Sequence, residues 1–212
     1  MALYITNHPL IQHKLTIMRK RETGTLEFRE LLKEIGMLMG YEVCRDFPLK
    51  EVEIETPMQK MTAHELDGKK VAVVPILRAG LGMVDGLLTL IPAAKVGHIG
   101  MYRDEKTHEP VFYYYKMPEG KDRMVILTDP MLATGGSLEL AYQALCTKGI
   151  PKQLHLCCVI AAQDGIDNLM KLFKPLDNVT LWCAAIDPIL NEHKYIVPGL
   201  GDAGDLAYGD KI

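Results

Sequence analysis

The sequence predicts an α/β fold in which helices flank a doubly wound, mostly parallel sheet. From residue 71 onward, short apolar runs bounded by turn residues alternate with stretches of helical spacing, and this order is typical of such a sheet. The runs are also apolar on both faces, as expected of parallel strands that helices cover on both sides.

One helix is expected before the sheet. After an irregular start, Thr25 is predicted to cap a helix that continues to about Gly40. Its apolar residues recur at helical spacing, so the helix is amphipathic with a charged outer face. These residues are Leu31, Leu32, Ile35, Leu38 and Met39.

Five apolar runs are interpreted as strands, namely VAVVP at 71–75, VGHIGMY at 96–102, MVILTD at 124–129, LHLCCVIAA at 154–162 and VTLWCAAID at 179–187. Helices are predicted between them at 81–90, 138–148 and 165–173. Gly149 and Pro151 end the second of these helices. No repeat or linker interrupts the order, so residues 1–212 are expected to form a single domain.

The segment RDEKTHEPVFYYYKMP, from Arg103 to Pro118, departs from the alternation because it is rich in charges and holds three consecutive tyrosines. We interpret it as a β-hairpin or flap that projects from the sheet. A solvated loop stiffened by its aromatic residues is nearly as consistent with the pattern.

Composition excludes several function classes. A net charge of -3 provides no broad attraction for nucleic acid or an anionic membrane, so neither is expected as a partner. The N-terminal sequence has no secretory signal pattern, and the five cysteines show no C-x-x-C spacing. We therefore expect a cytoplasmic protein with reduced thiols.

The stretch VILTDPMLATGGS, at 125–137, carries the features of an anion site. Loops at the carboxyl ends of parallel strands gather ligands, and the small residues here would let backbone N–H groups face a phosphate at a helix N-terminus. Thr134 and Ser137 add hydroxyl donors, and Asp129 is placed to accept hydrogen bonds from ribose hydroxyls.

This interpretation has two alternatives. A nucleoside triphosphate loop is excluded because the chain has no G-x-x-x-x-G-K-[ST] motif. The pattern alone does not decide between a phosphate cradle and a plain turn at Asp129-Pro130 followed by a helix cap.

Four segments together resemble the uracil phosphoribosyltransferases of the type I phosphoribosyltransferase family. They are ILRAG at 76–80, YRDE at 102–105, DPMLATGGS at 129–137 and YIVPGLGDAGD at 195–205. The resemblance implies transfer of a 5-phosphoribosyl group from 5-phosphoribosyl 1-pyrophosphate (PRPP) to uracil, which gives UMP and pyrophosphate in pyrimidine salvage. It also implies a flap and a C-terminal hood segment that binds the base.

The resemblance further implies residue roles. Arg78, Arg103 and Asp129 would be catalytic. PRPP would be bound by Arg78, Arg103, Asp129, Pro130, Met131, Leu132, Ala133, Thr134, Gly135, Gly136, Ser137 and Asp202. Uracil would be bound by Ile196, Gly201, Asp202 and Ala203, mainly through the backbone. Mg²⁺ is expected to be held mainly by PRPP, GTP is expected as an effector, and the protein is expected to be a homodimer or a higher homo-oligomer.

Single residues leave room for other interpretations. Arg78 and Arg103 could instead form surface salt bridges, although guanidinium groups suit phosphate oxygens. The tail carries Leu206 where the family usually has arginine, and AAQDG at 161–165 replaces the usual AAPEG. A phosphoribosyltransferase for another base and an RNA-binding regulator built on the same pocket are the rival functions, and the absence of a basic stripe disfavours the second.

Overall fold

The computed structural model describes residues 1–103 and 110–209, with the backbone alone at Arg103 and Pro110. The strands of its main sheet are β1 (Ala2–Ile5), β4 (Ala72–Leu77), β5 (Lys95–Val96), β6 (His98–Arg103), β7 (Pro110–Lys116), β8 (Met124–Thr128), β9 (Met131–Leu132), β10 (Gln153–Ala162) and β11 (Val179–Asp187). Their spatial order is β1-β11-β10-β8-β4-β6-β7, with β5 beside β4 and β9 beside β10. Only the β6·β7 pair of these described strands is antiparallel, which confirms the mostly parallel sheet.

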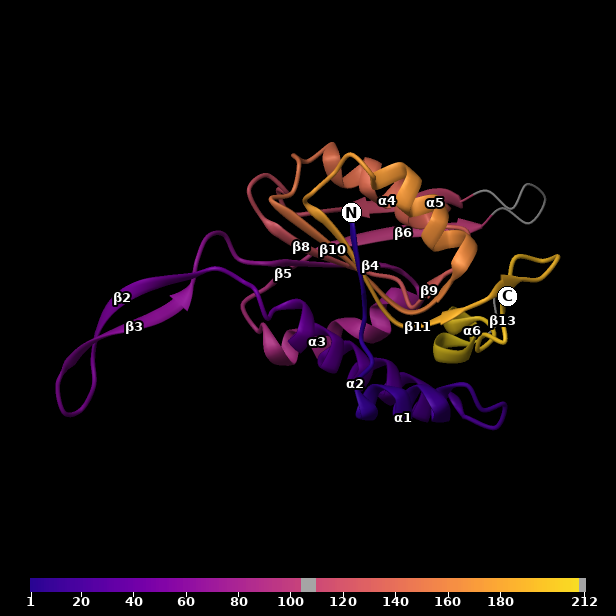
Figure 1. Ribbon diagram of the computed structural model, residues 1–212, viewed down its shortest axis with the longest axis horizontal. Helices are drawn as coiled ribbons and strands as arrows, with labels where there is room; N and C mark the ends of the chain where they lie inside the picture. The colour runs from indigo at the N-terminus through magenta and orange to yellow at the C-terminus, as the bar shows by residue number, and fades with distance from the viewer. Residues whose placement is uncertain (104–109, 210–212) are drawn as a thin grey trace.

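Helices cover both faces of this sheet (Figure 1). On one face lie α1 (Pro9–Met18), α2 (Thr25–Val43) and α3 (Val84–Leu90), and on the other lie α4 (Gly136–Cys146) and α5 (Gln163–Phe173). Each face has its own hydrophobic cluster, in which Phe28 of α2 and Phe173 of α5 are fully buried. The runs that are apolar on both sides therefore form the central strands because each side meets a helix layer.

Local details differ from the sequence predictions at helix ends. The residue that precedes α2 is Gly24, and Thr25 is the first helical residue rather than a cap. The helix also continues past Gly40 to Val43, because both residues are buried against the core. A 3-10 turn, η1 (Ala79–Met83), precedes α3, and α4 begins two residues before the predicted start.

The expectation of an irregular N-terminus was wrong, because residues 2–5 form β1 and residues 9–18 form α1. The short strand β1 pairs in parallel with β11, whose residues follow it by more than 170 positions. Its partner is far away in sequence, so neither local periodicity nor flanking turn residues mark it.

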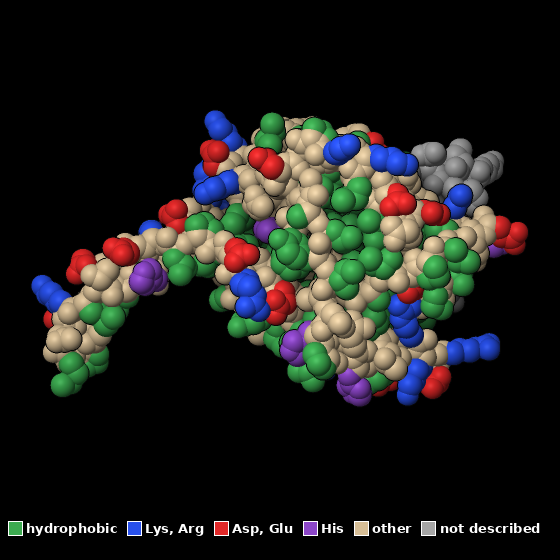
Figure 2. Space-filling model, in the orientation of Figure 1, with side chains coloured by type: hydrophobic (Ala, Val, Ile, Leu, Met, Phe, Trp, Pro, Cys, Tyr) green, Lys and Arg blue, Asp and Glu red, His purple; other side chains and the backbone are tan. Residues whose placement is uncertain are grey.

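A long hairpin made of β2 (Leu49–Glu55) and β3 (Lys60–Leu66) was not predicted from the sequence. It pairs in register over seven residues and extends away from the sheet as an arm. Nearly all of its side chains are exposed, and apolar groups lie along it in Figure 2. Within the predicted flap at 103–118, residues 110–116 form β7, which pairs antiparallel with β6 as the last strand of the main sheet and so does not project from it. Asp104 and Glu105 lie outside the described residues.

The C-terminal segment folds over the carboxyl edge of the sheet. It consists of β12 (Ile189–Leu190), β13 (Ile196–Val197) and α6 (Ala203–Tyr208), and α6 packs against α2 and η1. Parallel strands place the ends of β4, β6 and β8 at the same edge, so the loops after them face this segment. Among the described residues, no helix has both the length and the apolar character needed to cross a membrane.

Candidate active site

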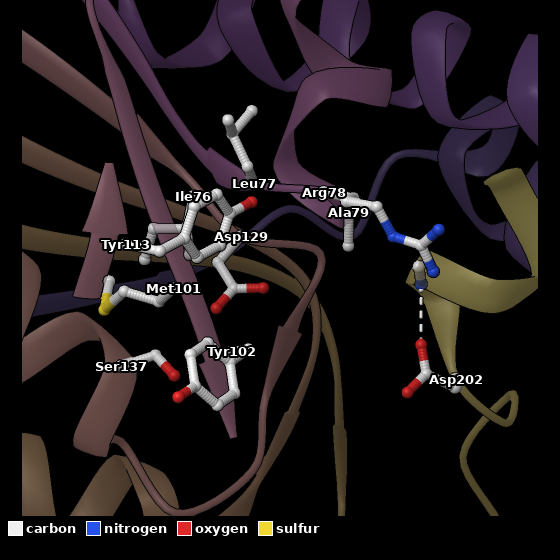
Figure 3. Close-up of a pocket in the computed structure, with 11 residues that line it drawn as sticks. Ile76, Leu77, Arg78, Ala79, Met101, Tyr102, Tyr113, Asp129, Ser137 and Asp202 are labelled. Atoms are coloured by element: carbon white, nitrogen blue, oxygen red, sulfur yellow. Dashed lines mark hydrogen bonds between the residues drawn. The ribbon is translucent and has the colours of Figure 1, made fainter. Parts of the chain in front are cut away.

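A cavity of about 450 Å³ lies at the carboxyl edge of the sheet (Figure 3). It brings together four of the predicted site residues, Arg78, Asp129, Ser137 and Asp202, from four different segments. The remaining lining residues come from β4, η1, β6, β7 and α6, and they are Ile76, Leu77, Ala79, Met101, Tyr102, Tyr113 and Gly204. The side chain of Arg103, the second predicted cation, lies outside what the structure describes.

Arg78 follows β4 directly and lines the cavity while also making an ion pair. Its Nη2 donates to Oδ1 of Asp205 at 2.8 Å and to the backbone oxygen of Gly209 at 3.0 Å. Arg78 therefore does form a salt bridge, which was the alternative to a role in phosphate binding, and its side chain still lines the cavity. Because a guanidinium has five N–H donors, these two bonds leave others for an anion.

The loop that carries Arg78 is pressed against the strand that carries Asp129. The hydroxyl of Thr128, at the end of β8, donates to the backbone oxygen of Gly80 at 2.9 Å. A side chain at Gly80 would overlap the backbone oxygen of Thr128, so only glycine allows this approach. This contact fixes the distance between Arg78, which is predicted to bind the pyrophosphate, and Asp129, which is predicted to bind the ribose.

Asp129 lies one residue beyond β8 and is half buried. Its Oδ1 accepts a long hydrogen bond of 3.4 Å from the backbone N–H of Met131. Burial raises the pKa of the neighbouring Cys158 thiol, and the Asp129 carboxylate raises it further. That thiol therefore stays protonated beside the acid and contributes no charge to the site.

The predicted phosphate loop, residues 130–137, ends at the N-terminus of α4. The residue before the helix is Gly135, with a φ of +92° and no side chain to cap the helix. The first amides of α4 are therefore not engaged by a capping side chain, as an anion site requires. Pro130 and Leu132 are buried beneath the loop, and Met131 and Ala133 are half buried.

The loop divides its residues between two cavities. Ser137 faces the cavity of Asp129, whereas Thr134, Gly135 and Gly136 line a neighbouring cavity of about 520 Å³ against α5. Asn168 of α5 donates to the backbone oxygen of Thr134 at 3.1 Å, a support that no sequence pattern indicated.

The predicted base segment forms a turn that ends in α6. Asp202 accepts hydrogen bonds from the N–H groups of Gly204 at 2.8 Å and Asp205 at 3.1 Å, so its carboxylate caps α6 (Figure 3). Gly201 lines a third cavity of about 660 Å³, and Asp202 lines both this cavity and the first one. The side chains of Ile196 and Ala203 are buried, which leaves only their backbone for a ligand.

The third cavity is also lined by residues that the sequence did not single out. Arg19 lines it from the end of α1, and it binds the buried Asp187 at the end of β11. Leu206, which stands in place of the usual arginine, packs against the core and lines the same cavity. No local pattern could reveal the first pair because 168 residues separate its members.

Metal binding by protein groups alone is not supported in the described part of the chain, where no three His, Cys, Asp or Glu residues are grouped to hold an ion. Asp129 and Asp202 nevertheless place two carboxylates on one cavity. One or two carboxylates together with substrate phosphates and water suit Mg²⁺.

Comparisons with known proteins agree with one another. A family model described as uracil phosphoribosyltransferase matches residues 5–210. The chain is 57% identical over 207 residues to a uracil phosphoribosyltransferase of Clostridioides difficile, covering 97% of each chain. It is 56% identical over 209 residues to one of Lactococcus lactis, covering 98% of each. A solved structure of a protein from Aquifex aeolicus is 38% identical, with a TM-score of 0.92 and 99% of both chains covered.

Proposed function

Because the chain belongs to the uracil phosphoribosyltransferase family, we propose that its cavity at Arg78, Asp129, Ser137 and Asp202 holds PRPP while the C-terminal turn holds uracil. The protein is a pentosyltransferase that converts uracil and PRPP into UMP and pyrophosphate in pyrimidine salvage. The observation that carries the proposal is that one cavity joins the ends of β4 and β8 to the cap of α6.

The donor's ribose 5-phosphate is assigned to Asp129 and to residues 130–137. The helix dipole and the amides at the start of α4 favour a phosphate there, and the hydroxyl of Ser137 adds a donor. The half-buried Asp129 carboxylate is placed to accept hydrogen bonds from the two ribose hydroxyls. This assignment leaves the opposite end of the donor directed toward Arg78.

The pyrophosphate is assigned to Arg78 and Arg103. Arg78 keeps N–H donors beyond those it gives to Asp205 and Gly209, so it can bind phosphate oxygens while it remains tied to the tail. Mg²⁺, held mainly by the phosphates of PRPP, would neutralise part of the charge of the leaving pyrophosphate.

Uracil is assigned to the turn that contains Ile196, Gly201 and Ala203. The base offers alternating carbonyl acceptors and N–H donors, which backbone groups can match without charged side chains. Asp202 lines both the turn's cavity and the donor cavity, so its position between the two substrates favours a role facing the donor.

In the reaction, N1 of uracil forms a bond to C1 of the ribose while the bond from C1 to pyrophosphate breaks and N1 loses its proton. The ribose develops oxocarbenium character, so the chain contributes mainly by positioning and by charge placement. The β6·β7 flap, whose Tyr102 and Tyr113 line the cavity, would close and exclude the water that competes for the donor.

The test of the donor assignment is Asp129→Asn. We expect PRPP binding in the presence of Mg²⁺ to weaken by about tenfold or more, because hydrogen bonds to a charged group are lost. The matched control is Asp167→Asn on the exposed face of α5, which should bind PRPP as the original protein does. Normal PRPP binding by folded Asp129→Asn, measured by titration calorimetry, would show that the acid does not hold the ribose.

A second assay separates uracil specificity from its rivals. PRPP, Mg²⁺ and each free base are supplied in turn, and released pyrophosphate is measured. Pyrophosphate release is expected with uracil and with none of the other bases. Release with another base instead would favour a different specificity, and no release with any base would favour the RNA-binding regulator.

A homo-oligomer is also proposed, and the arm of β2 and β3 supports it. Leu49, Ile54, Met58, Met61 and Leu66 are exposed along this hairpin, and Met58 at its tip is 91% exposed. An isolated two-stranded hairpin is marginally stable in water, so contact with a second copy of the chain would stabilise it (Figure 2).

Three further assignments follow from the family and the thiols. The free state of all five cysteines is consistent with action in the cytoplasm. Residues 1–212 are proposed to act as one domain, since both core clusters share the main sheet. GTP is proposed as an effector, and activity measured with and without GTP tests that assignment.

A further inference from the structure

The pair formed by Arg19 and Asp187 holds the backbone of the C-terminal turn. The two side chains form a bidentate ion pair, with Nη1 2.7 Å from Oδ2 and Nη2 2.8 Å from Oδ1. Nη1 of Arg19 also donates to the backbone oxygen of Gly199 at 2.7 Å, and the N–H of Gly199 donates to Oδ2 of Asp187 at 2.9 Å. Both polar groups of one glycine are therefore held by one ion pair.

The glycine at this position belongs to a tight turn. Gly199 has a φ of +60°, and a side chain there would overlap the backbone oxygen of Ile196. The turn leads from Ile196 to Gly201, two of the backbone positions assigned to uracil. A displacement at Gly199 would therefore move both of them.

The pair connects this turn to the rigid part of the molecule. Asp187 ends β11 and pairs in register with Ala162 of β10, and its side chain is only 6% exposed. Arg19 follows α1, whose apolar side packs in the core, and its side chain is 23% exposed. The turn is thus fixed to the sheet whose other strands carry the donor site.

We propose that Arg19 and Asp187 are positioning residues that set the affinity for uracil by fixing the turn at 196–201. This inference rests on the proposed backbone recognition of uracil by that turn. Neither side chain lines the donor cavity, so PRPP binding should not depend directly on the pair.

The test measures the KM for uracil and the KM for PRPP in variants of the full chain. Removing one partner of a buried ion pair can unfold a protein, whereas replacing both by apolar side chains often preserves the fold. The main variant is therefore the double change Arg19→Met with Asp187→Leu, with Arg19→Lys as the conservative variant. Lys14→Met is the control, because it removes a different ion pair from the same helix α1, that with Glu34.

We expect the double variant to raise the KM for uracil by about tenfold or more, which is the effect of losing one hydrogen bond to a charged group. The KM for PRPP should change by less than about threefold. Arg19→Lys should give an intermediate KM for uracil, because lysine keeps the positive charge but lacks the planar guanidinium that binds a carboxylate through two hydrogen bonds. Lys14→Met should leave both KM values unchanged.

The proposal is overturned if the KM for uracil in the folded double variant stays within about twofold of the original, or if both KM values rise in parallel. If the double variant does not fold, the same comparison of the KM for uracil with the KM for PRPP is made in Arg19→Lys. Gly201→Ala tests the proposed uracil site separately from the positioning role, because a φ of +89° at this position strains any residue other than glycine. An unchanged KM for uracil in Gly201→Ala would refute the uracil site itself. A raised KM in Gly201→Ala together with an unchanged KM in the Arg19 variants would refute only the positioning role.

Discussion

Replacing Gly80 by alanine should impair catalysis in a protein that still folds. The new methyl group would overlap the backbone oxygen of Thr128 and approach the Cα of Pro75 to 3.3 Å. These are backbone atoms of two central strands, so relief requires the loop to move by about 1 Å, and a misplacement of that size can cost about 100-fold in rate. The affected distance is the one between Arg78 and Asp129.

The assay for Gly80→Ala is kcat/KM for PRPP, together with thermal unfolding. We expect kcat/KM to fall by about 100-fold, with a stability loss of about 1 to 3 kcal/mol from overpacking. Gly24→Ala is the matched control, because no atom lies within 4 Å of a side chain added there. A kcat/KM within about threefold of the original would refute the idea that this contact sets the geometry of the site.

Three further outcomes are expected. Leu206→Arg should change the KM for uracil by less than about threefold, because backbone groups are assigned to read the base; a larger drop in KM would show that a cation belongs there. Burial lowers the pKa of His155 from 6.5 to about 4, so the neutral form is favoured in the fold and stability should fall as pH drops from 6.5 toward 4. Comparison of urea unfolding at pH 7 and pH 4.5 should show a loss of roughly 2 to 3 kcal/mol from this group, and His155→Gln should lose correspondingly less. Ile54→Lys combined with Met61→Lys on the arm should reduce the mass of the oligomer in light scattering, whereas Lys50→Glu on the same arm should reduce it less; an unchanged mass in the first variant would exclude the arm as the contact.

Much of the candidate site was predictable because several of its residues directly follow strands. A parallel sheet brings the ends of β4 and β8 to one edge, and the resemblance of ILRAG and DPMLATGGS to the family's motifs placed Arg78 and Asp129 in one predicted site. Asp202 was identified in the same way from its motif, although its role as the cap of α6 was not. The residues of the phosphate loop were also named, but not their division between two cavities.

Other features depend on contacts that no local pattern carries. The arm of β2 and β3 is exposed on both faces, so it lacks the alternation of buried and exposed residues that marks a strand. Asn168 supports the phosphate loop from a different helix, with nothing in its neighbourhood to indicate the bond.

The sequence by itself determined the α/β class, five strands of the main sheet and the residues of the candidate site, because burial between two helix layers and motif chemistry can both be recognised from short stretches of sequence. Only the tertiary structure decided that Arg78 is tied to Asp205 and that Arg19 and Asp187 hold Gly199. The bonds that Arg78 makes to Asp205 and that Arg19 makes to Asp187 and Gly199 join residues more than 120 positions apart, and they form only after the fold has brought these distant segments together.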